Sequence, residues 1–286
     1  MGLDAIAERL APNSATRDAL RAWLEFGVSA GVLRCSNGRY AIRSRLARRI
    51  ADPENDALAA FIQELAQMDG PAVLRMPVLL SQGKLFTIAD QQGEIVARSS
   101  RITEPLIFEA IDAIVPRRGA FRVLDVGCGS GTYMRHSAER NQELTAMGIE
   151  LQPDVAAFAL DNLSKWGVGS RTAVESGDIR ARPPNPEFDL VMLNNNIYYF
   201  GVAERPDLIR HLRGFLRANG RLLLTTPCPS RNVFYGILDL WSAGTAGWGR
   251  LPEREELLKQ MRQAGFSDVS AKSLIPGAGY YAFVGR

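Results

Sequence analysis

Four compact apolar runs, separated by helical stretches, most strongly limit what this chain can fold into. The runs are RVLDV (122–126), LTAMGIE (144–150), FDLVML (188–193) and RLLLTT (221–226), and the helical patterns cover 132–141, 153–166 and 204–217. Apolar strands that alternate with helices predict an α/β fold with a parallel sheet that is covered on both faces. A further helix over 252–264 leads to FSDVSAKS and YYAFVG, which we expect to close the sheet as an antiparallel pair.

The N-terminal part predicts a helix followed by a hairpin. Asn13 or Ser14 can cap a helix over 15–30, because both side chains can accept from a free backbone N–H of the first turn. VLRCSNGRYAI (32–42) then predicts two short strands around Asn37-Gly38, a dipeptide that tolerates the positive φ of a tight turn.

A domain boundary is expected near residue 100. Residues 54–69 predict a long amphipathic helix, and residues 70–100 mix short apolar runs with Gly and Pro. The strand and helix alternation begins beyond them. We therefore expect a smaller, mainly helical domain over 1–100 and a larger α/β domain over 101–286.

A glycine-rich loop, DVGCGSG, follows the first apolar run directly. Gly127, Gly129 and Gly131 let the backbone turn sharply and approach a ligand closely where the next helix begins. A dinucleotide fingerprint needs GxGxxG, and its third glycine would fall on Thr132. The pattern DxGxGxG instead resembles motif I of the class I S-adenosylmethionine-dependent methyltransferases, which implies a Rossmann-like sheet of seven strands and S-adenosylmethionine as cofactor.

Polar residues at later strand ends match the same family over about residues 105–286. The resemblance implies that Glu150 accepts hydrogen bonds from both ribose hydroxyls and that Leu151 packs on the adenine. It further implies that Asp178 takes the adenine amino group beside the backbone N–H of Ile179. Asn194, at the end of FDLVML, matches motif IV of the family, where the chain meets the methionine end of the cofactor.

Charges near the loop fit a cofactor that carries a sulfonium and an ammonium. Asp125, below the loop, is expected to supply a favourable potential, and the absence of a lysine after the loop argues against a triphosphate. Arg101, in the segment ARSSRITEP before the α/β domain, is a candidate for the cofactor carboxylate.

The front of the chain resembles the winged-helix domain that precedes the catalytic domain of small-molecule O-methyltransferases. That domain dimerises and roofs the substrate pocket, so the resemblance implies a homodimer and a small-molecule substrate. A cluster of arginines without acids between them also admits a DNA-binding winged helix; it comprises Arg34, Arg39, Arg43, Arg45, Arg48 and Arg49. The net charge of residues 1–100 is only +1, from 12 Lys and Arg against 11 Asp and Glu, which weighs against nucleic acid.

Composition restricts the remaining possibilities. Cys35, Cys128 and Cys228 are far apart and lack CxxC spacing, so neither a disulfide framework nor a metal site is expected. No apolar stretch approaches the roughly 20 residues of a membrane span, and we expect a cytoplasmic protein. His136 and His211 are the only histidines, and both fall within predicted helices.

The shortage of histidine bears directly on mechanism. In the O-methyltransferases that the layout resembles, a histidine beyond motif IV removes the proton of the acceptor, whereas NNNIYYF (194–200) and the segment after Thr226 contain none. We therefore expect a carboxylate, thioether, amine or activated-carbon acceptor, or a phenol handled by Tyr198 or Tyr199. Asn195 is a candidate for orienting acceptor oxygens, and the two tyrosines for contacting the sulfonium.

Two other functions stay open. A fold of this class that holds the cofactor's own amine behind its γ-carbon would release methylthioadenosine and azetidine-2-carboxylate, as methyltransferase-like cyclases do. A winged-helix DNA-binding regulator is the second. Residues 227–250, rich in aromatics and glycine, predict a mobile cap over the acceptor pocket.

Overall fold

A computed structural model describes residues 1–10 and 13–286 of the protein. The chain forms two compact units, residues 1–59 and 60–286. The break in contacts therefore comes about forty residues before the boundary expected near residue 100. The physical reason is a small apolar cluster in which Met68, Met76 and Phe86 pack with Trp241 of the α/β part. The assignment of residues 1–100 to a separate functional domain stays a prediction.

The first unit contains the expected hairpin. Its elements are α1 (Leu3–Leu10), α2 (Ser14–Ser29), β1 (Leu33–Ser36), β2 (Arg39–Ile42), α3 (Arg45–Ile50) and the 3-10 turn η1 (Pro53–Asn55). Asn13 is the N-cap of α2, since its Oδ1 accepts from the backbone N–H of Thr16 at 3.0 Å. Asn37 and Gly38 take positive φ angles of 49° and 67° between the paired strands, which confirms the predicted hairpin. The winged-helix assignment of this unit stays a prediction.

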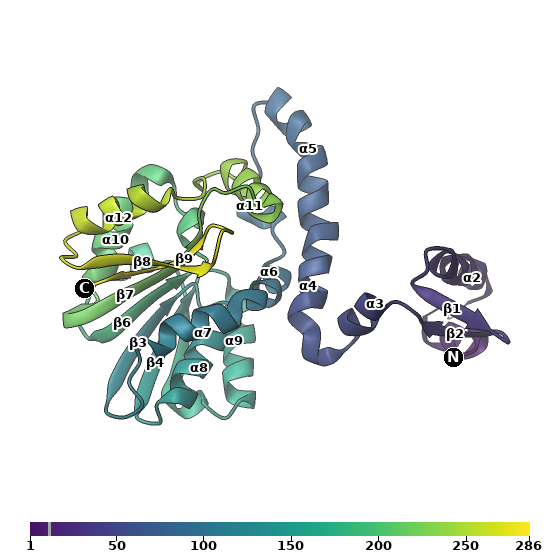
Figure 1. Cartoon of the computed structure of the whole chain (residues 1–286), viewed down its shortest axis with the longest axis horizontal. Helices are drawn as coiled ribbons and strands as arrows, with labels where there is room; N and C mark the ends of the chain where they lie inside the picture. Colours follow the sequence, from purple (N-terminus) through teal and green to yellow (C-terminus); the bar gives the residue numbers. More distant parts are fainter. Residues whose placement is uncertain (11–12) are drawn as a thin grey trace. The chain divides into compact units, whose positions relative to one another are not determined.

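A seven-stranded sheet forms the centre of the second unit, as expected (Figure 1). The strand order is β5-β4-β3-β6-β7-β9-β8, and β9 runs antiparallel to both β7 and β8. The strands are β3 (Phe121–Val126), β4 (Leu144–Glu150), β5 (Thr172–Ser176), β6 (Phe188–Asn194), β7 (Leu216–Pro227), β8 (Val269–Ile275) and β9 (Tyr280–Gly285). A sheet of seven strands is what the resemblance in the sequence implied.

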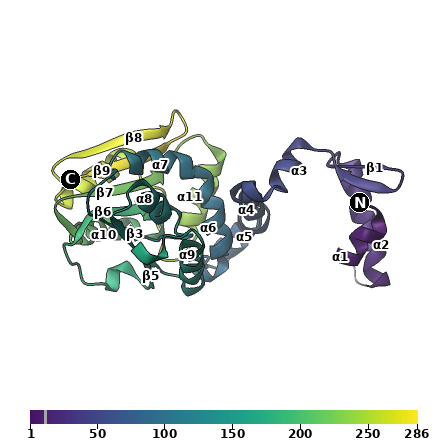
Figure 2. The ribbon, with the colours of Figure 1, turned by 90° about the horizontal axis from the view of Figure 1, so that it is seen from below.

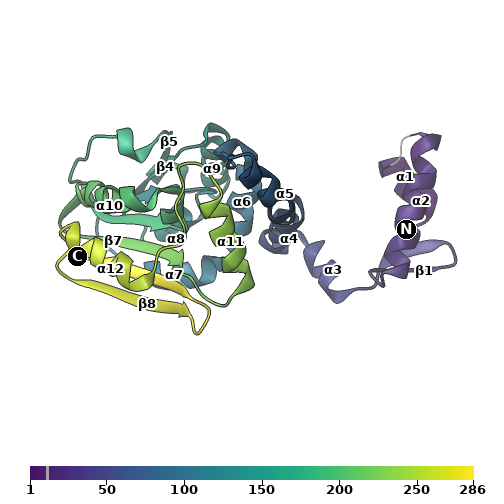
Figure 3. The same ribbon diagram turned by 90° about the horizontal axis from the view of Figure 1, so that it is seen from above.

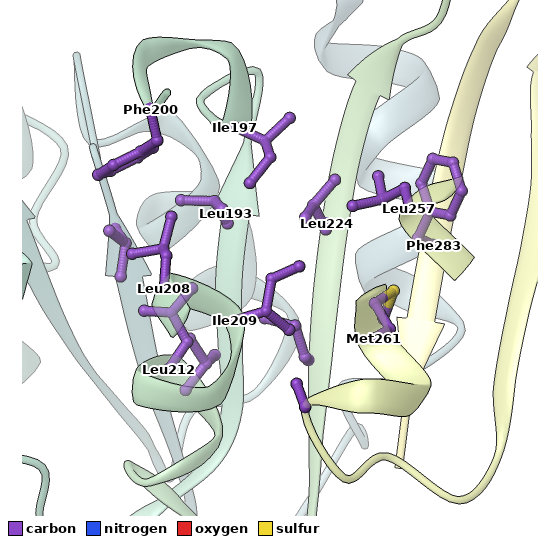
Figure 4. Packing of buried hydrophobic residues seen from close by; sticks show 14 of the residues in the cluster. Leu193, Ile197, Phe200, Leu208, Ile209, Leu212, Leu224, Leu257, Met261 and Phe283 are labelled. Atoms are coloured by element: carbon purple, nitrogen blue, oxygen red, sulfur yellow. The ribbon is translucent and has the colours of Figure 1, made fainter. Parts of the chain in front are cut away.

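Helices cover both faces of this sheet (Figures 1 and 2). One face carries α7 (Glu104–Asp112), α8 (Thr132–Arg140) and α9 (Pro153–Lys165), and the other carries α10 (Arg205–Arg213) and α12 (Arg254–Gln263). Alternate residues of each strand point to opposite faces, so Val123 packs with the first group and Leu124 with the second. Figure 4 shows the hydrophobic core on the face that carries α10 and α12, where Leu208 and Leu212 of α10 and Met261 of α12 pack against the strands.

A long helix runs through residues that the sequence pattern divides. It consists of α4 (Asp56–Glu64), a π-helical turn η2 (Leu65–Asp69) and α5 (Gly70–Ser81) (Figure 1). We expected the helix to end at residue 69, before Gly70 and Pro71. It continues because the π turn shifts the hydrogen bonding: the Gly70 N–H donates to the carbonyl of Leu65. The turn η3 (Ile88–Asp90), α6 (Gly93–Ser99) and the turn η4 (Ser100–Thr103) follow.

The segment expected as a cap contains a helix, α11 (Val233–Ala243) (Figure 3). Just beyond α11, Phe86 pairs with the chain as in a short parallel sheet. The Phe86 N–H donates to Gly244 O, and the Ala246 N–H donates to Phe86 O, each at 2.8 Å. Residues 60–100 and 227–250, far apart in the sequence, are therefore held together.

Neither a disulfide bond nor a metal cluster is found among the described residues. Their three cysteines are free. Across residues 1–10 and 13–286 no group of three or more His, Cys, Asp or Glu side chains is placed to hold a metal ion. In the same residues no helix is both long and apolar enough to cross a membrane.

Leu212→Ala tests the core under α10. Leu212 is fully buried, so its truncation leaves a cavity and should lower the free energy of unfolding by about 2–5 kcal/mol. Urea denaturation followed by circular dichroism measures this change. Leu160→Ala, at a 47% exposed position on α9, is the control and should change stability by less than about 0.5 kcal/mol. Equal effects of the two substitutions would contradict the packing.

Candidate functional site

One cavity of about 500 Å³ opens at the carboxyl ends of β3, β4 and β6. The glycine loop and residues 149–152 and 177–180 line one part of it. Residues 194–200, the segment from η3 to η4, and residues 246–248 line the rest. Ligands of open α/β sheets bind at this edge, because the loops that follow parallel strands gather there.

The three glycines of the loop meet different needs. All have positive φ angles, 67° at Gly127, 55° at Gly129 and 81° at Gly131. A Cβ at Gly127 would collide with the side-chain amide of Asn196, and one at Gly131 would come within 3.1 Å of Leu163. Gly129 has open space, with nothing nearer than a 3.9 Å contact to Ala97. Gly127 and Gly129 line the cavity, whereas Gly131 serves the start of α8.

Glu150 is held at the end of β4 by backbone donors. Its Oε2 accepts from the Gly129 N–H and its Oε1 from the Gln152 N–H, both at 3.1 Å. Burial raises the pKa of this carboxyl, and the backbone hydrogen bonds oppose that rise. The glycine loop and Glu150 are thereby held next to each other in one site.

Asp125 is a buried acid at the end of β3, directly before the glycine loop. It does not line the cavity, and both of its oxygens are buried without a hydrogen-bond partner among the described residues. Burial and the nearby Glu150 charge raise its pKa to about 8. Both causes disfavour the ionised form of Asp125, and the favourable potential expected from this residue stays a prediction.

Asn194 is another buried side chain whose hydrogen-bonding capacity is only partly used. Its Oδ1 accepts from the Thr225 hydroxyl at 2.9 Å, and its Nδ2 has no partner among the residues described. It lines the cavity at the end of β6. A buried amide that retains a free donor can hold a ligand or a water molecule.

The residues that the resemblance assigns to the adenine also line the cavity. Leu151, Asp178 and Ile179 all line it, and Leu151 is 50% exposed. Asp178 is not free: Arg180 bonds its carboxylate at 2.7 Å and, as the largest effect, lowers its pKa. This ion pair joins residues two apart in the sequence, but the sequence analysis did not predict it.

Arg101 lies at the opposite side of the cavity. Its Nε donates to Glu104 Oε1 at 2.8 Å, a partner three residues away that the sequence analysis did not consider. The arginine is therefore positioned on the lining, and its contact with a cofactor carboxylate stays a prediction.

Three aromatic side chains, Tyr198, Tyr199 and Trp248, form what we term the aromatic wall of the cavity. The ring centroids of the two tyrosines are 5.1 Å apart, and those of Tyr199 and Trp248 are 4.3 Å apart. Gln91 Nε2 donates to the Tyr199 hydroxyl at 3.0 Å. Burial raises the pKa of both tyrosines. Gln91 and Trp248 carry no local sequence signal and were not among the predicted residues.

Asn195 is fixed in a left-handed backbone conformation with φ of 50°. Its Oδ1 accepts from the Tyr280 hydroxyl at 2.9 Å, and its Nδ2 donates to Thr103 Oγ1 at 3.3 Å. A positive φ at a residue other than glycine is uncommon and concentrates at functional sites. Tyr280 and Thr103 were not predicted, because each lies 85 or more residues from Asn195.

Neither histidine lines the cavity. His136 contacts Asp112 at 2.9 Å and stacks on Phe108, and His211 contacts the carbonyl oxygen of Ile179 at 2.9 Å. Asp189, at the far end of β6, pairs with Arg217 at 3.0 Å away from this cavity.

Arg205 ties the aromatic wall to the chain beyond α11. This arginine is 2% exposed, and it donates to the carbonyl of Phe200 at 3.2 Å and to that of Arg250 at 2.5 Å. The Gly249 N–H donates to Tyr198 O at 3.1 Å. Residues 246–250 are therefore hydrogen-bonded to the loop that carries the tyrosines.

Residues 123–220, which contain the glycine loop, Glu150, Asp178 and Asn194, match the family model described as "Methyltransferase domain". Over these residues the chain is similar to a methyltransferase domain. Its sheet and helices are those of the class I methyltransferases, as the resemblance implied.

The individual relatives are only distantly similar to this chain. The 27-O-demethylrifamycin SV methyltransferase of Amycolatopsis mediterranei is 28% identical over 136 residues, which cover 47% of each chain. An O-methyltransferase family protein from Burkholderia thailandensis superposes with a TM-score of 0.76 at 19% identity, covering all of this chain and 88% of that one. Human N-acetylserotonin methyltransferase, solved with S-adenosylmethionine, gives 0.75 at 14% identity, covering 100% and 87%. The chain spans about half the length, or less, of the first curated relatives that it matches.

Asp125→Asn tests the buried acid. The unfolded carboxyl titrates near 3.8 and the folded one near 8, so between these values the folded state holds one more proton and stability falls as pH rises. The variant should lose this contribution, which amounts to about 1.4 kcal/mol per pH unit. Urea denaturation at pH 5, 6, 7 and 8 measures the slope. Asp161→Asn, on the surface of α9, should keep the wild-type slope, and an equally steep Asp125→Asn variant would contradict the assignment.

Proposed function

We propose that this protein is a methyltransferase that transfers the methyl group of S-adenosylmethionine to a small molecule by in-line displacement without a histidine base. The observation that carries the proposal is a single cavity with two chemically different halves. One half holds the glycine loop with Glu150, and the other holds the aromatic wall with Asn195. No histidine of the chain lies in its lining.

The residues present fit the cofactor. Gly129 leaves open space beside the loop, and the Glu150 carboxylate, already oriented by two backbone N–H groups, keeps acceptor capacity for ribose hydroxyls. Leu151, Asp178 and Ile179 would surround the adenine, with Asp178 sharing its charge with Arg180. Asn194 and Arg101 would contact the methionine end. Bound S-adenosylmethionine supplies an electrophilic methyl group.

The rest of the mechanism falls to alignment by this chain. Holding a nucleophile at about 3 Å from the methyl carbon and in line with its bond is worth on the order of 7–11 kcal/mol. Asn195, fixed by Tyr280 and Thr103, would orient acceptor oxygens, and Tyr198 and Tyr199 would contact the cationic centre. A base is needed only if the acceptor carries a proton at neutral pH. The names of similar proteins include both O-methyltransferases and N-methyltransferases, and they support oxygen or nitrogen as the acceptor atom.

Product analysis tests the function. The purified protein, incubated with S-adenosylmethionine and a small-molecule extract, should form S-adenosylhomocysteine only when the extract is present. Liquid chromatography of the nucleosides measures this. Methylthioadenosine formed without extract would instead establish the cyclase, and salt-dependent DNA retention without either nucleoside would establish a DNA-binding regulator.

Glu150→Ala should weaken cofactor binding about 5- to 150-fold, because the hydrogen bonds to the ribose hydroxyls are lost. Glu139→Ala, on the surface of α8, is the control and should leave cofactor affinity unchanged.

We also propose that the chain forms a homodimer. Apolar side chains stand exposed on α5 and at the start of α11, among them Leu74 at 79%, Val78 at 56% and Val233 at 73%. Clustered apolar surface of this kind typically marks an interface. Light scattering should give the mass of a dimer for the wild type and of a monomer for Leu74→Glu. Leu160→Glu on α9 should stay dimeric, and a monomeric wild type would exclude the proposal.

A further inference from the structure

Tyr280 places a hydroxyl group inside the core of the second unit. It is the first residue of β9, and its side chain is 1% exposed. Its ring packs in the hydrophobic core on the face that carries α7, α8 and α9. A buried tyrosine hydroxyl needs a hydrogen-bond partner, and this one donates to Asn195 Oδ1 at 2.9 Å. The hydroxyl therefore contacts a residue of the cavity lining, although Tyr280 itself does not line the cavity.

Further hydrogen bonds lead from Asn195 to the turn η4. Asn195 Nδ2 donates to Thr103 Oγ1 at 3.3 Å, and the Thr103 hydroxyl donates to the carbonyl oxygen of Ser100 at 2.9 Å. Because the hydroxyl proton of Thr103 goes to Ser100, Thr103 Oγ1 accepts at Asn195, and the amide nitrogen faces it. Tyr280, Asn195 and Thr103 form what we term the Tyr280 network, which runs from β9 through the end of β6 to η4.

The turn η4 (Ser100–Thr103) carries Ser100 and Arg101, which both line the cavity. Arg101 lies in the sequence between the two residues that the Thr103 hydroxyl ties together. A 3-10 turn has poorer hydrogen-bond geometry than an α-helix, so bonds from outside the turn help to hold its shape. The position of Arg101 therefore depends on Thr103 and on the hydrogen bond that Asn195 makes to it.

Asn195 is a rigid attachment point for this turn. Its backbone N–H donates to the carbonyl oxygen of Thr225 on β7 at 2.8 Å, and its φ angle of 50° is left-handed. A left-handed residue other than glycine persists only where the surrounding structure fixes it. Because the Tyr280 hydroxyl binds its side-chain oxygen, the amide cannot rotate away from Thr103 without losing that bond. The sheet thereby holds η4 through the Asn195 side chain.

We propose that Tyr280 is a positioning residue for the cofactor, which raises the affinity for its methionine end by holding the turn that carries Arg101. The proposal rests on the proposed function, since it assumes that the cavity binds S-adenosylmethionine with Arg101 at its carboxylate. Tyr280 acts through Asn195 and Thr103, without touching the cofactor. An arginine that is already held in place binds an anion more tightly, because less side-chain freedom is lost on binding.

The effect should be confined to one end of the cofactor. Glu150, which we propose to bind the ribose, is held by the backbone N–H groups of Gly129 and Gln152 and not by the Tyr280 network. S-adenosylhomocysteine carries the amino-acid chain with its carboxylate. Methylthioadenosine has the same adenosine and a thioether sulfur but lacks that carboxylate. A comparison of the two ligands therefore separates the methionine end from the adenosine end.

Calorimetric titration of the whole protein tests the proposal without a methyl acceptor. Tyr280→Phe removes only the hydroxyl and should weaken binding of S-adenosylhomocysteine about 3- to 10-fold, as for one hydrogen bond, while methylthioadenosine affinity changes less than twofold. Thr103→Val breaks the network at its other end and should give the same pattern. Tyr281→Phe is the matched control: Tyr281 is the next residue of β9 and packs on the opposite face of the sheet, so both ligands should bind as in the wild type.

A double-mutant cycle shows whether Tyr280 acts through Arg101. Arg101→Ala alone should weaken binding of S-adenosylhomocysteine about 10-fold or more, because a charged hydrogen bond is lost. Adding Tyr280→Phe to this variant should weaken binding further by less than twofold, since coupled residues are not additive. Fully additive effects would overturn the proposal.

The remaining outcomes separate this proposal from the proposed function. Equal weakening of both ligands by Tyr280→Phe would show a merely structural role and overturn the proposal. Unchanged affinity for S-adenosylhomocysteine in both Tyr280→Phe and Thr103→Val would overturn it as well, while leaving the proposed function standing. A wild type that binds neither ligand would overturn the proposed function itself.

Discussion

The pairing of β3 between β4 and β6 is the constraint on which the site depends. Both pairings are parallel, with Asp125 opposite Gly148 on one side and Met192 on the other. Parallel strands end at the same edge, so the glycine loop, Glu150 and Asn194 are brought together by the register alone. A Cβ at Gly148 would come within 2.7 Å of Cys128 Sγ, so the loop folds back closely over β4. The hydrogen bond from Gly129 to Glu150 follows from that approach.

The acceptor side depends on a different set of contacts. Residues 60–100 and 227–250 meet through the Phe86 hydrogen bonds and through the apolar cluster of Met76 and Trp241. Arg205 then ties the end of that region to Phe200. The aromatic wall is therefore assembled from segments that are remote in sequence, and the wall's shape follows from helix packing rather than from the sheet.

The features that sequence reasoning predicted are those that local chemistry encodes. Asn37-Gly38 forms the expected turn, because its positive φ angles are a property of the two residues themselves. The spacing of glycines and strand-end acids likewise predicts the loop and its neighbours. Local reasoning did not predict effects that depend on a partner or on burial. Arg180 pairs with Asp178, and burial raises the pKa of Asp125 to about 8. The helix also continues past Gly70 because a π turn changes its hydrogen bonding.

The sequence by itself determined the parallel sheet, the glycine loop at its edge and a chain with two histidines. These depend on residue type and short spacing, which act within a few residues along the chain. Only the tertiary structure decided that Gln91, Trp248 and Tyr280 join the side chains in and around the cavity. The reason is that burial and charge at a site depend on side chains that lie close in space, and folding brings these together from positions up to about 180 residues apart.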